Sequence, residues 1–533
     1  TTGEQYLGKA ISATKIQLLE NEGYLYGTAD GAITKGKPVQ VKSDGDFQMV
    51  SETTTSYSFA QGSSADVEQG TNTHGAIYYD DDLNKMVVIN ADASPGGGND
   101  KLTIFYGTVT GGTTNSISFA TGNVIGDYTN VTLTNIAASF DPISKTTLVG
   151  VNNGSAGQAF AFTRSSTTSI SHGTIGVSFY SGNPDGIDIV NVGEDKWVIG
   201  YQQGNDYPAV RVATASGTTL SFGTEVVVNS SSSASSSTAS NAGFSMSYDT
   251  TSSQVVIFYR NSSGEIKAKV GTVSGTDISF GSAVPSSGTF TPGTQHYPHP
   301  GAQKYVPAKD VHIVAYDKNS TGAVTVLKTS GSGTSATLVD ASGTAPGTSS
   351  FTAFDSQPSL KPNIFVAYES TPVIVYSDDS VDINSIAVSI DGTTPTMGTD
   401  RAIETTTSHS TIAGAYDPDT KRAVIIFKEN SNNDLYYQVV TIEGTETTTN
   451  MATDGESYLG IATKTVANDA QAEVATFGQI DAQQSSLTAG QKYFVQSDGS
   501  LATSADTSVP GYSGTVTTVA GKALSATKLL ISE

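Results

Sequence analysis

Residues 243–282 read GFSMSYDTTSSQVVIFYRNSSGEIKAKVGTVSGTDISFGS, and this stretch decides the fold. Its β-branched and aromatic residues gather in four short segments with the composition of strands. These segments are residues 243–249, 254–260, 266–273 and 277–282. Turn-forming residues join the first segment to the second and the second to the third. The stretch therefore predicts a four-stranded antiparallel meander.

The turn after the first segment recurs along the chain as an aromatic residue followed by Asp. The recurrences are Tyr79-Asp80, Phe140-Asp141, Tyr248-Asp249 and Tyr416-Asp417. We expect the aromatic side chain to pack and the Asp to cap the turn. Tyr79 and Tyr416 lie 337 residues apart with Tyr248 midway, which gives a period of about 56 residues and hence seven repeats. A unit of this length is the size of a propeller blade, so the sequence predicts an all-β fold with a seven-bladed β-propeller.

Two further patterns follow the same period. Apolar second strands stand where the remaining repeats require them, at residues 196–201, 311–316 and 373–376. A Ser-Phe motif with a Gly one to three residues after the Phe closes several repeats, at residues 116–122, 220–224 and 278–282. The seventh repeat lacks this motif after residue 442, but an extra copy stands at residues 56–62, before the first repeat. We therefore expect residues 57–67 to pair beside residues 435–442 and close the ring, which removes two open sheet edges.

Composition limits the classes of partner. The chain has 533 residues, a net charge of −23 from 50 acidic and 27 basic residues, and no cysteine. Such a field repels phosphate backbones and anionic membranes, so nucleic acid is not an expected partner. Without cysteine there are no disulfides and no thiolate metal ligands. The longest apolar runs, such as residues 255–259, have the length of strands, so we predict no membrane span. No signal peptide is visible, and the removal of a leader before Thr1 stays open.

The two ends of the chain echo each other. The first pair of similar segments is GKAISATKI at Gly8–Ile16 and GKALSATKL at Gly521–Leu529. The second pair is residues 33–45 and 487–499, each ending in Ser-Asp-Gly, and the third is Tyr-Leu-Gly at residues 6–8 and 458–460. We expect residues 1–55 and 446–533 to form a β module, with the propeller of residues 56–445 inserted between its halves. By analogy this module serves in attachment or in forming a homo-oligomer.

Histidines and acidic clusters are the candidate metal ligands. His296 and His299 could form a metal pair, but we favour an inter-blade loop stiffened by prolines, because no third ligand stands near in the sequence. We expect His312, within a strand, to be a packed core residue. Asp80-Asp81-Asp82 and Asp378-Asp379 could hold calcium, but both lack the oxygen spacing of a calcium loop, so solvated turns are the favoured interpretation.

Motifs for catalysis are weak. The glycine-rich residues 94–100 lack the Lys and Ser/Thr of a phosphate loop and predict a hairpin loop. The Ser-rich residues 229–240 predict an exposed loop, either a tolerated insertion or a binding segment. The chain has a single Trp, Trp197, and lacks the turns of a sialidase, although distant carboxylates that converge at a propeller mouth leave glycosidase chemistry open. We predict no enzyme and no cofactor, and we assign no catalytic, metal-binding or ligand-binding residue.

Several of these motifs together resemble structural proteins of tailed bacteriophages, especially tail and fibre proteins of the marine cyanophage type. The motifs are Val270–Val273, Ile278–Gly281, Tyr416–Thr420 and the terminal strand from Gly521 to Leu529. The resemblance implies a virion component that is assembled in the host cytoplasm and binds other virion proteins. It is either tail-associated, with a host glycan or receptor as its target, or a capsid decoration or head fibre. A carbohydrate-active enzyme and a bacterial adhesin are the alternatives.

Overall fold

The structure is a computed structural model, and the chain separates in it into two compact units. Thr1–Ser56 and Thr445–Glu533 form one, here called the terminal unit, and Tyr57–Gly444 form the other, called the central unit. The described residues are 8–12, 15–18, 23–68, 71–93, 100–111, 115–128, 133, 135–204, 207–230, 243–261, 265–285, 296–318, 321–333, 336–339, 351–352, 362–368, 370–378, 382–405, 409–429, 431, 434–452, 457–507, 509–510, 512 and 514–532.

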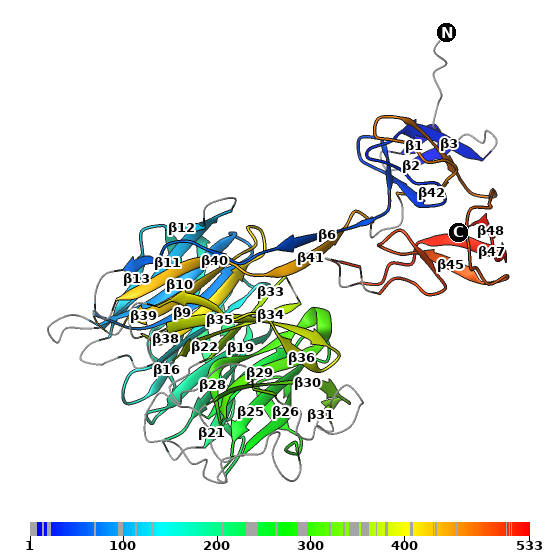
Figure 1. The fold of residues 1–533 in the computed structure, drawn as a ribbon. Coiled ribbons are helices and arrows are strands. Elements are labelled where there is room, and N and C mark those ends of the chain that lie inside the picture. The colour runs from blue at the N-terminus through cyan, green and yellow to red at the C-terminus, as the bar shows by residue number, and fades with distance from the viewer. Residues whose placement is uncertain are drawn as a thin grey trace. The chain divides into compact units, whose positions relative to one another are not determined.

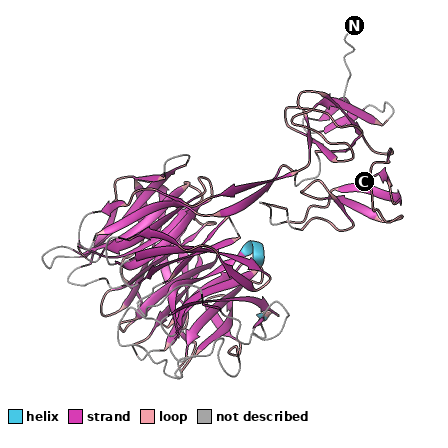
Figure 2. Ribbon diagram, in the orientation of Figure 1, coloured by secondary structure: helices cyan, strands magenta, loops and turns pink. Residues whose placement is uncertain are grey.

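The predicted all-β fold is confirmed. Strands dominate both units (Figure 2). A 3₁₀ turn, η1 (Pro307–Lys309), lies between strands. No helix in the described ranges has the length and apolar character that crossing a membrane requires.

The template stretch forms the predicted meander, with strands in the order β24–β25–β26–β27. Their bounds are β24 (Phe244–Asp249), β25 (Gln254–Arg260), β26 (Ile266–Ser274) and β27 (Asp277–Phe280). All seven residues of β25 are buried, as are all seven of the equivalent strand β15. A strand whose two faces are both covered reads as a continuous apolar run, which is why Val255 to Tyr259 show no alternation.

Six further sheets in the described part of the central unit repeat this order, and each adds a fifth strand paired with its third. We name each sheet by its first strand. The β9 sheet holds β9 (Thr71–Asp80), β10 (Lys85–Ala93), β11 (Asp100–Thr110), β12 (Ser116–Phe119) and β13 (Asn123–Tyr128). The β14 sheet holds β14 (Asn135–Asp141), β15 (Thr146–Asn152), β16 (Gly157–Ser166), β17 (Ser169–His172) and β18 (Val177–Tyr180). The β19 sheet holds β19 (Asp185–Gly193), β20 (Lys196–Gln202), β21 (Pro208–Ser216), β22 (Thr219–Phe222) and β23 (Val226–Val227).

The other three sheets follow beyond the template. The β28 sheet holds β28 (His296–Val306), β29 (Val311–Lys318), β30 (Thr321–Ser330), β31 (Thr337–Val339) and β32 (Phe351–Thr352). The β33 sheet holds β33 (Asn363–Ala367), β34 (Thr371–Asp378), β35 (Asp382–Asp391), β36 (Thr394–Met397) and β37 (Arg401–Glu404). The β38 sheet holds β38 (His409–Asp417), β39 (Arg422–Glu429), β40 (Leu435–Thr441), β7 (Ala60–Gln61) and β8 (Ala65–Glu68).

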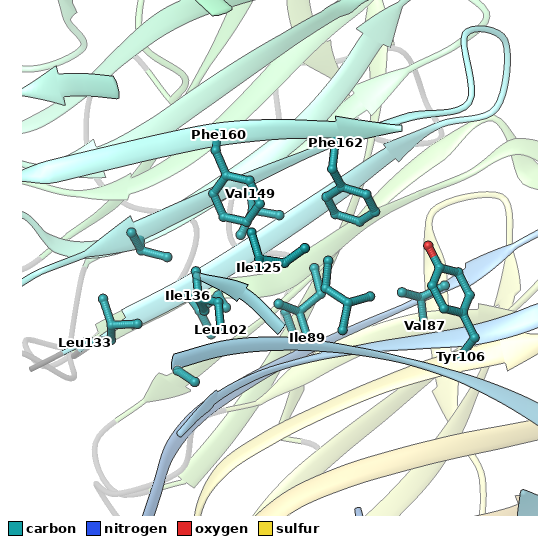
Figure 3. Close-up of a cluster of buried hydrophobic side chains, with 14 residues drawn as sticks. Val87, Ile89, Leu102, Tyr106, Ile125, Leu133, Ile136, Val149, Phe160 and Phe162 are labelled. Carbon is teal, nitrogen blue, oxygen red and sulfur yellow. The ribbon is translucent and has the colours of Figure 1, made fainter. Parts of the chain in front are cut away.

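The first strands of these sheets lie against one another in chain order. Strand β9 lies against β14, β14 against β19, β19 against β24, β24 against β28, β28 against β33, and β33 against β38. Strand β38 in turn lies against β9, and Figure 1 labels these two strands side by side. Apolar side chains fill the space between neighbouring sheets, as Figure 3 shows for Ile89 and Leu102 of the β9 sheet and Val149 and Phe160 of the β14 sheet. Meander sheets stacked in this way are the arrangement of a β-propeller.

The N-terminal segment provides the outer strands of the β38 sheet. Gln61 pairs with Val440 and Ala60 with Thr441, so the predicted pairing of residues 57–67 beside residues 435–442 is confirmed. Strand β8 also pairs with β40, as β13 pairs with β11 in the β9 sheet. The segment therefore occupies the position that a fourth and fifth strand occupy elsewhere.

Three of the glycines that follow an outer strand approach the neighbouring sheet closely. A Cβ on Gly223 would lie 1.8 Å from the carbonyl oxygen of Thr276, in the next sheet, and one on Gly173 would lie 1.9 Å from that of Thr218. Gly62, in the displaced copy of the motif, stands in the same relation to Asn115 of the β9 sheet, at 2.0 Å. Side chains are excluded from these positions because the neighbouring sheet approaches so closely.

The terminal unit contains two five-stranded sheets of the same design. The first sheet has the order β3–β43–β42–β4–β5 and the second the order β44–β48–β47–β45–β46. The strands of the first are β3 (Tyr24–Thr28), β43 (Gln471–Ala475), β42 (Tyr458–Ala462), β4 (Pro38–Val41) and β5 (Phe47–Met49). The strands of the second are β44 (Ile480–Asp481), β48 (Lys528–Ile531), β47 (Val519–Ser525), β45 (Lys492–Val495) and β46 (Leu501–Ala502).

The two sheets match in register as well as in order. In the first, Pro38 pairs with Ile461, Val39 with Gly460 and Gln40 with Tyr458; in the second, Lys492 pairs with Lys522, Tyr493 with Gly521 and Phe494 with Val519. Both pairings skip one residue at the same place, between the last two pairs. The sequence echo at the two chain ends therefore reflects a duplicated β unit, with the central unit inserted into the first copy.

Two smaller sheets complete the terminal unit. Strands β1 (Gly8–Ser12) and β2 (Lys15–Leu18) form a hairpin. Strands β6 (Glu52–Tyr57) and β41 (Gly444–Thr449) pair where the chain passes between the units. The hydroxyl groups of Thr54 and Thr447 lie 3.0 Å apart across this pair. The chain therefore leaves the terminal unit and returns to it along one two-stranded ribbon.

Candidate functional site

The Asp of the recurring aromatic–Asp turn caps that turn, as predicted. Asp249 Oδ1 accepts hydrogen bonds from the backbone N–H groups of Thr251 at 2.8 Å and Ser252 at 2.9 Å. The same oxygen of Asp417 accepts from the second and third residues after it, at 2.9 and 3.2 Å. The turn recurs because a carboxylate there pairs backbone donors that the strands leave unpaired.

The acidic cluster at Asp80 corrects one prediction. Asp80 is fully buried, and its carboxylate makes a bidentate ion pair with Arg164 of the β14 sheet. Arg164 also contacts Asp82 at 3.0 Å. A solvated turn was the favoured interpretation, and for Asp80 that interpretation is wrong, because a basic residue from a distant part of the sequence covers it. The ion pair of Asp80 with Arg164 therefore links the β9 sheet to the β14 sheet.

A Ser–His–Asp constellation joins the β24 sheet to the β28 sheet. Ser247 and Asp249 lie two residues apart on β24 and so share a face, and His312 projects from β29. The Ser247 Oγ lies 2.7 Å from His312 Nδ1, and His312 Nε2 lies 3.8 Å from Asp249 Oδ2. The carboxylate beside Nε2 favours a proton on that nitrogen, so Nδ1 accepts from the serine hydroxyl.

Burial decides what this constellation does. Ser247 is 3% exposed, and both His312 and Asp249 are 0% exposed. Gln303 donates to Ser247 Oγ at 2.7 Å, and the Thr329 hydroxyl donates to Asp249 Oδ2. A substrate has no route to the serine, so the network is a buried structural junction rather than a nucleophile with its base. The prediction that His312 is a packed core residue is confirmed.

Burial and hydrogen bonding shift the pKa values of this pair. Burial lowers the pKa of His312, and the attraction of Asp249 does not overcome that effect. Burial acts to raise the pKa of Asp249, but the nearby His312 ring and the hydrogen bonds from Thr329 and Ser252 outweigh burial and lower it. The junction therefore holds a neutral imidazole beside a carboxylate.

Asp188 is a buried acid on an innermost strand, β19, that the sequence analysis did not single out. Its Oδ2 accepts from the backbone N–H of Met246 at 2.9 Å and from that of Gly301 at 3.4 Å. Burial raises its pKa, against the attraction of Lys304. One carboxylate thus contacts the innermost strands of two further sheets, β24 and β28. The sequence feature that could have identified Asp188 is its place in the middle of an apolar strand.

The other predicted positions can be placed only in part. The predicted inter-blade loop at His296 and His299 is wrong, because both residues lie in strand β28, which pairs with β29. His299 is 3% exposed, while the side chain of His296 lies outside the described residues. The side chain of Asp378, all of Asp379, residues 94–99 and residues 231–240 also lie outside them. Within the described ranges, no group of three or more His, Asp or Glu side chains has the geometry of a metal site.

A small cavity lies between the β33 sheet and the N-terminal segment at Phe59. Arg401 and Glu443 form an ion pair beside it, and the Arg401 guanidinium lies 5.8 Å from the centre of the Phe59 ring. Its volume of about 10 Å³ is the room of a single water molecule. A charged pair with an aromatic ring is suited to polar ligands, but this cavity is too small to admit one.

Comparisons with known proteins give similarity at the level of strand arrangement. No family model and no curated protein matches the chain. A chain of the mitotic checkpoint complex is 9% identical, with a TM-score of 0.43, and the match covers 71% of this chain and 93% of that chain. AofleA from Arthrobotrys oligospora is 9% identical, with a TM-score of 0.35 and coverage of 83% and 98%. A mutant of the Aleuria aurantia lectin is 15% identical, with a TM-score of 0.36 and coverage of 63% and 97%.

Proposed function

We propose that the central unit is a seven-bladed β-propeller closed by its N-terminal strand. The cyclic order of the first strands, from β9 to β38 and back to β9, supports this proposal. The Gly62–Asn115 contact supports it further, because it repeats between the last sheet and the first the contact made by Gly173 and Gly223 within the ring. In the same proposal the two chain ends form one attachment module.

We propose that the protein is a structural component of the bacteriophage virion surface, tail-associated or fibre-like. The terminal unit binds the particle, and the propeller takes part in host adsorption. The observation that carries this proposal is the single ribbon of β6 and β41, since both passages of the chain run through it. A domain inserted in this way into a duplicated β unit is displayed from one place, as an adsorption domain requires.

Mass spectrometry of purified phage particles tests the proposal. We expect the protein in the particles at a fixed ratio to the other virion proteins, whereas its absence would contradict the assignment. The location of the protein on the particle distinguishes a tail-associated protein from a capsid decoration or head fibre. Detection on a bacterial surface without particles would favour an adhesin.

A glycan-depolymerisation assay separates binding from catalysis. The full chain is incubated with host surface glycans, and the size of the products is measured. We expect binding without shortening of the glycan. Shortening that is lost when carboxylates on the propeller loops are replaced by amides would support a carbohydrate-active enzyme instead.

A further inference from the structure

The hairpin of β1 and β2 is a third copy of the hairpin that completes each sheet of the terminal unit. Its pairs are Gly8 with Leu18, Lys9 with Gln17, Ala10 with Ile16 and Ser12 with Lys15. The pairs of β47 and β48 are Gly521 with Ile531, Lys522 with Leu530, Ala523 with Leu529 and Ser525 with Lys528. The spacing and the skipped residue are identical, and Lys, Ala and Ser recur at the same positions.

The other two copies show what surrounds such a hairpin. The hairpin of β42 and β43 lies between β4 and β3, and the hairpin of β47 and β48 lies between β45 and β44. In each case one flanking strand pairs with the first strand of the hairpin and the other with the second. The β1–β2 hairpin forms a two-stranded sheet among the described residues. A strand edge without a neighbouring strand is a template for pairing with another chain.

We propose that the β1–β2 hairpin docks into a partner protein that presents an open copy of this β unit. The partner supplies two strands equivalent to β45 and β44 and leaves between them a gap two strands wide. The hairpin fills the gap by strand addition, with the register of β47 and β48. A second intact copy of this chain is not the partner, because its own hairpins already fill both of its gaps.

The proposal deepens the proposed function, since it rests on the terminal unit being the attachment module. Its partner is then a neighbouring virion protein. The docking itself is a property of this chain and is measured without particles. Failure of docking and absence from the virion are therefore separate results.

A cysteine cross-link tests the docking, and the chain is suited to it because it has no cysteine of its own. The donor is the full chain with Lys9→Cys. The acceptor is residues 19–518 with Lys492→Cys, which lacks both the β1–β2 hairpin and the β47–β48 hairpin. Lys9 corresponds to Lys522, which pairs with Lys492, so we expect a disulfide between donor and acceptor.

Two controls set the scale. The intact chain carrying Lys492→Cys and Lys522→Cys should form the same bond internally, which verifies the geometry. A donor with Ala10→Cys should cross-link at least tenfold less, because a shift of one residue turns the side chain to the other face. Removing residues 1–18 from a donor that carries no added cysteine should likewise reduce its noncovalent binding to the acceptor at least tenfold.

A second acceptor covers the case in which the truncated chain does not fold. It is residues 19–533 with Lys492→Cys and a protease site at residues 512–514, and it is cut only after folding, so that the donor competes with the released hairpin. The proposal is overturned if neither acceptor cross-links while the internal control does. The proposal is equally overturned if an intact chain with Lys9→Cys cross-links to an intact chain with Lys492→Cys as efficiently as the donor cross-links to the acceptor.

Discussion

Gly62 lies so close to Asn115 that a Cβ on the glycine would be 2.0 Å from the carbonyl oxygen of the asparagine. The two residues are close because the N-terminal segment occupies the outer position of the last sheet, beside the first. Asn115 also donates from its side-chain amide to the carbonyl oxygen of Ala60 at 2.9 Å. The last sheet therefore approaches the first as closely as neighbouring sheets approach each other at Gly173 and Gly223.

Replacing Gly62 by Ala should destabilise the central unit by about 1–3 kcal/mol, the usual cost of forcing a group into a packed site. Thermal unfolding of the full chain measures the effect. The matched control is Gly111→Ala, whose Cβ would meet Thr420 at an ordinary 3.6 Å. If the two variants unfold at the same temperature, the close contact at Gly62 does not hold in solution.

Replacing Asp80 by Asn should cost about 3–5 kcal/mol, because it leaves the Arg164 guanidinium without the buried half of its ion pair. The midpoint of denaturant unfolding of the central unit is the measurement. Asp81→Asn is the control, since Asp81 is largely exposed and 3.8 Å from Lys145, and it should change stability by less than about 0.5 kcal/mol. Equal effects of the two substitutions would contradict the buried junction.

Stability should depend on pH through His312. Its folded pKa is lowered by burial, so below a pH of about 6.5 the unfolded chain binds a proton that the folded chain does not. Stability is therefore complete above that pH and falls as the pH falls, by up to about 1.4 kcal/mol per unit. The lowered pKa of Asp249 acts only below the ordinary range of an Asp and does not affect this window.

Thermal unfolding between pH 7.5 and 5.0 measures this dependence in the parent chain and in His312→Gln. We expect the slope to be smaller in the variant, whatever its absolute stability. A slope that is the same in both proteins would show that His312 accepts a proton in the folded state.

Gly460 and Gly521 should be equally intolerant of substitution. Their φ angles are +148° and +153°, and a Cβ would lie 2.0 Å from the carbonyl oxygen of Ala475 or 2.2 Å from that of Leu530. Each Gly→Ala change should destabilise the terminal unit, by about 1–3 kcal/mol. Limited proteolysis of the terminal unit measures the loss. A large effect at one glycine and none at the other would contradict the duplicated design.

Local patterns were enough to predict the strands and their order. The run from Val255 to Tyr259 identified a strand covered on both faces, and the aromatic–Asp turn located equivalent positions across 337 residues. The displaced outer-strand motif at residues 56–62 predicted the pairing with β40 because a repeat that lacks a strand must find one elsewhere.

The junctions between sheets could not be predicted in the same way. Arg164 covers Asp80 from a position 84 residues away, and His312 reaches Ser247 across 65 residues. Their pairing depends on the packing of adjacent sheets, which a single sequence does not record. The third hairpin was visible as a repeated segment, but its significance depended on the register of the other two.

An electron cryomicroscopy map of the purified particle tests the central claim most directly. We expect the terminal unit to contact the particle and the propeller to face outward, with one propeller for each terminal unit. A map in which the propeller is seated in the particle and the terminal unit is exposed, or in which the protein is absent, would contradict the account.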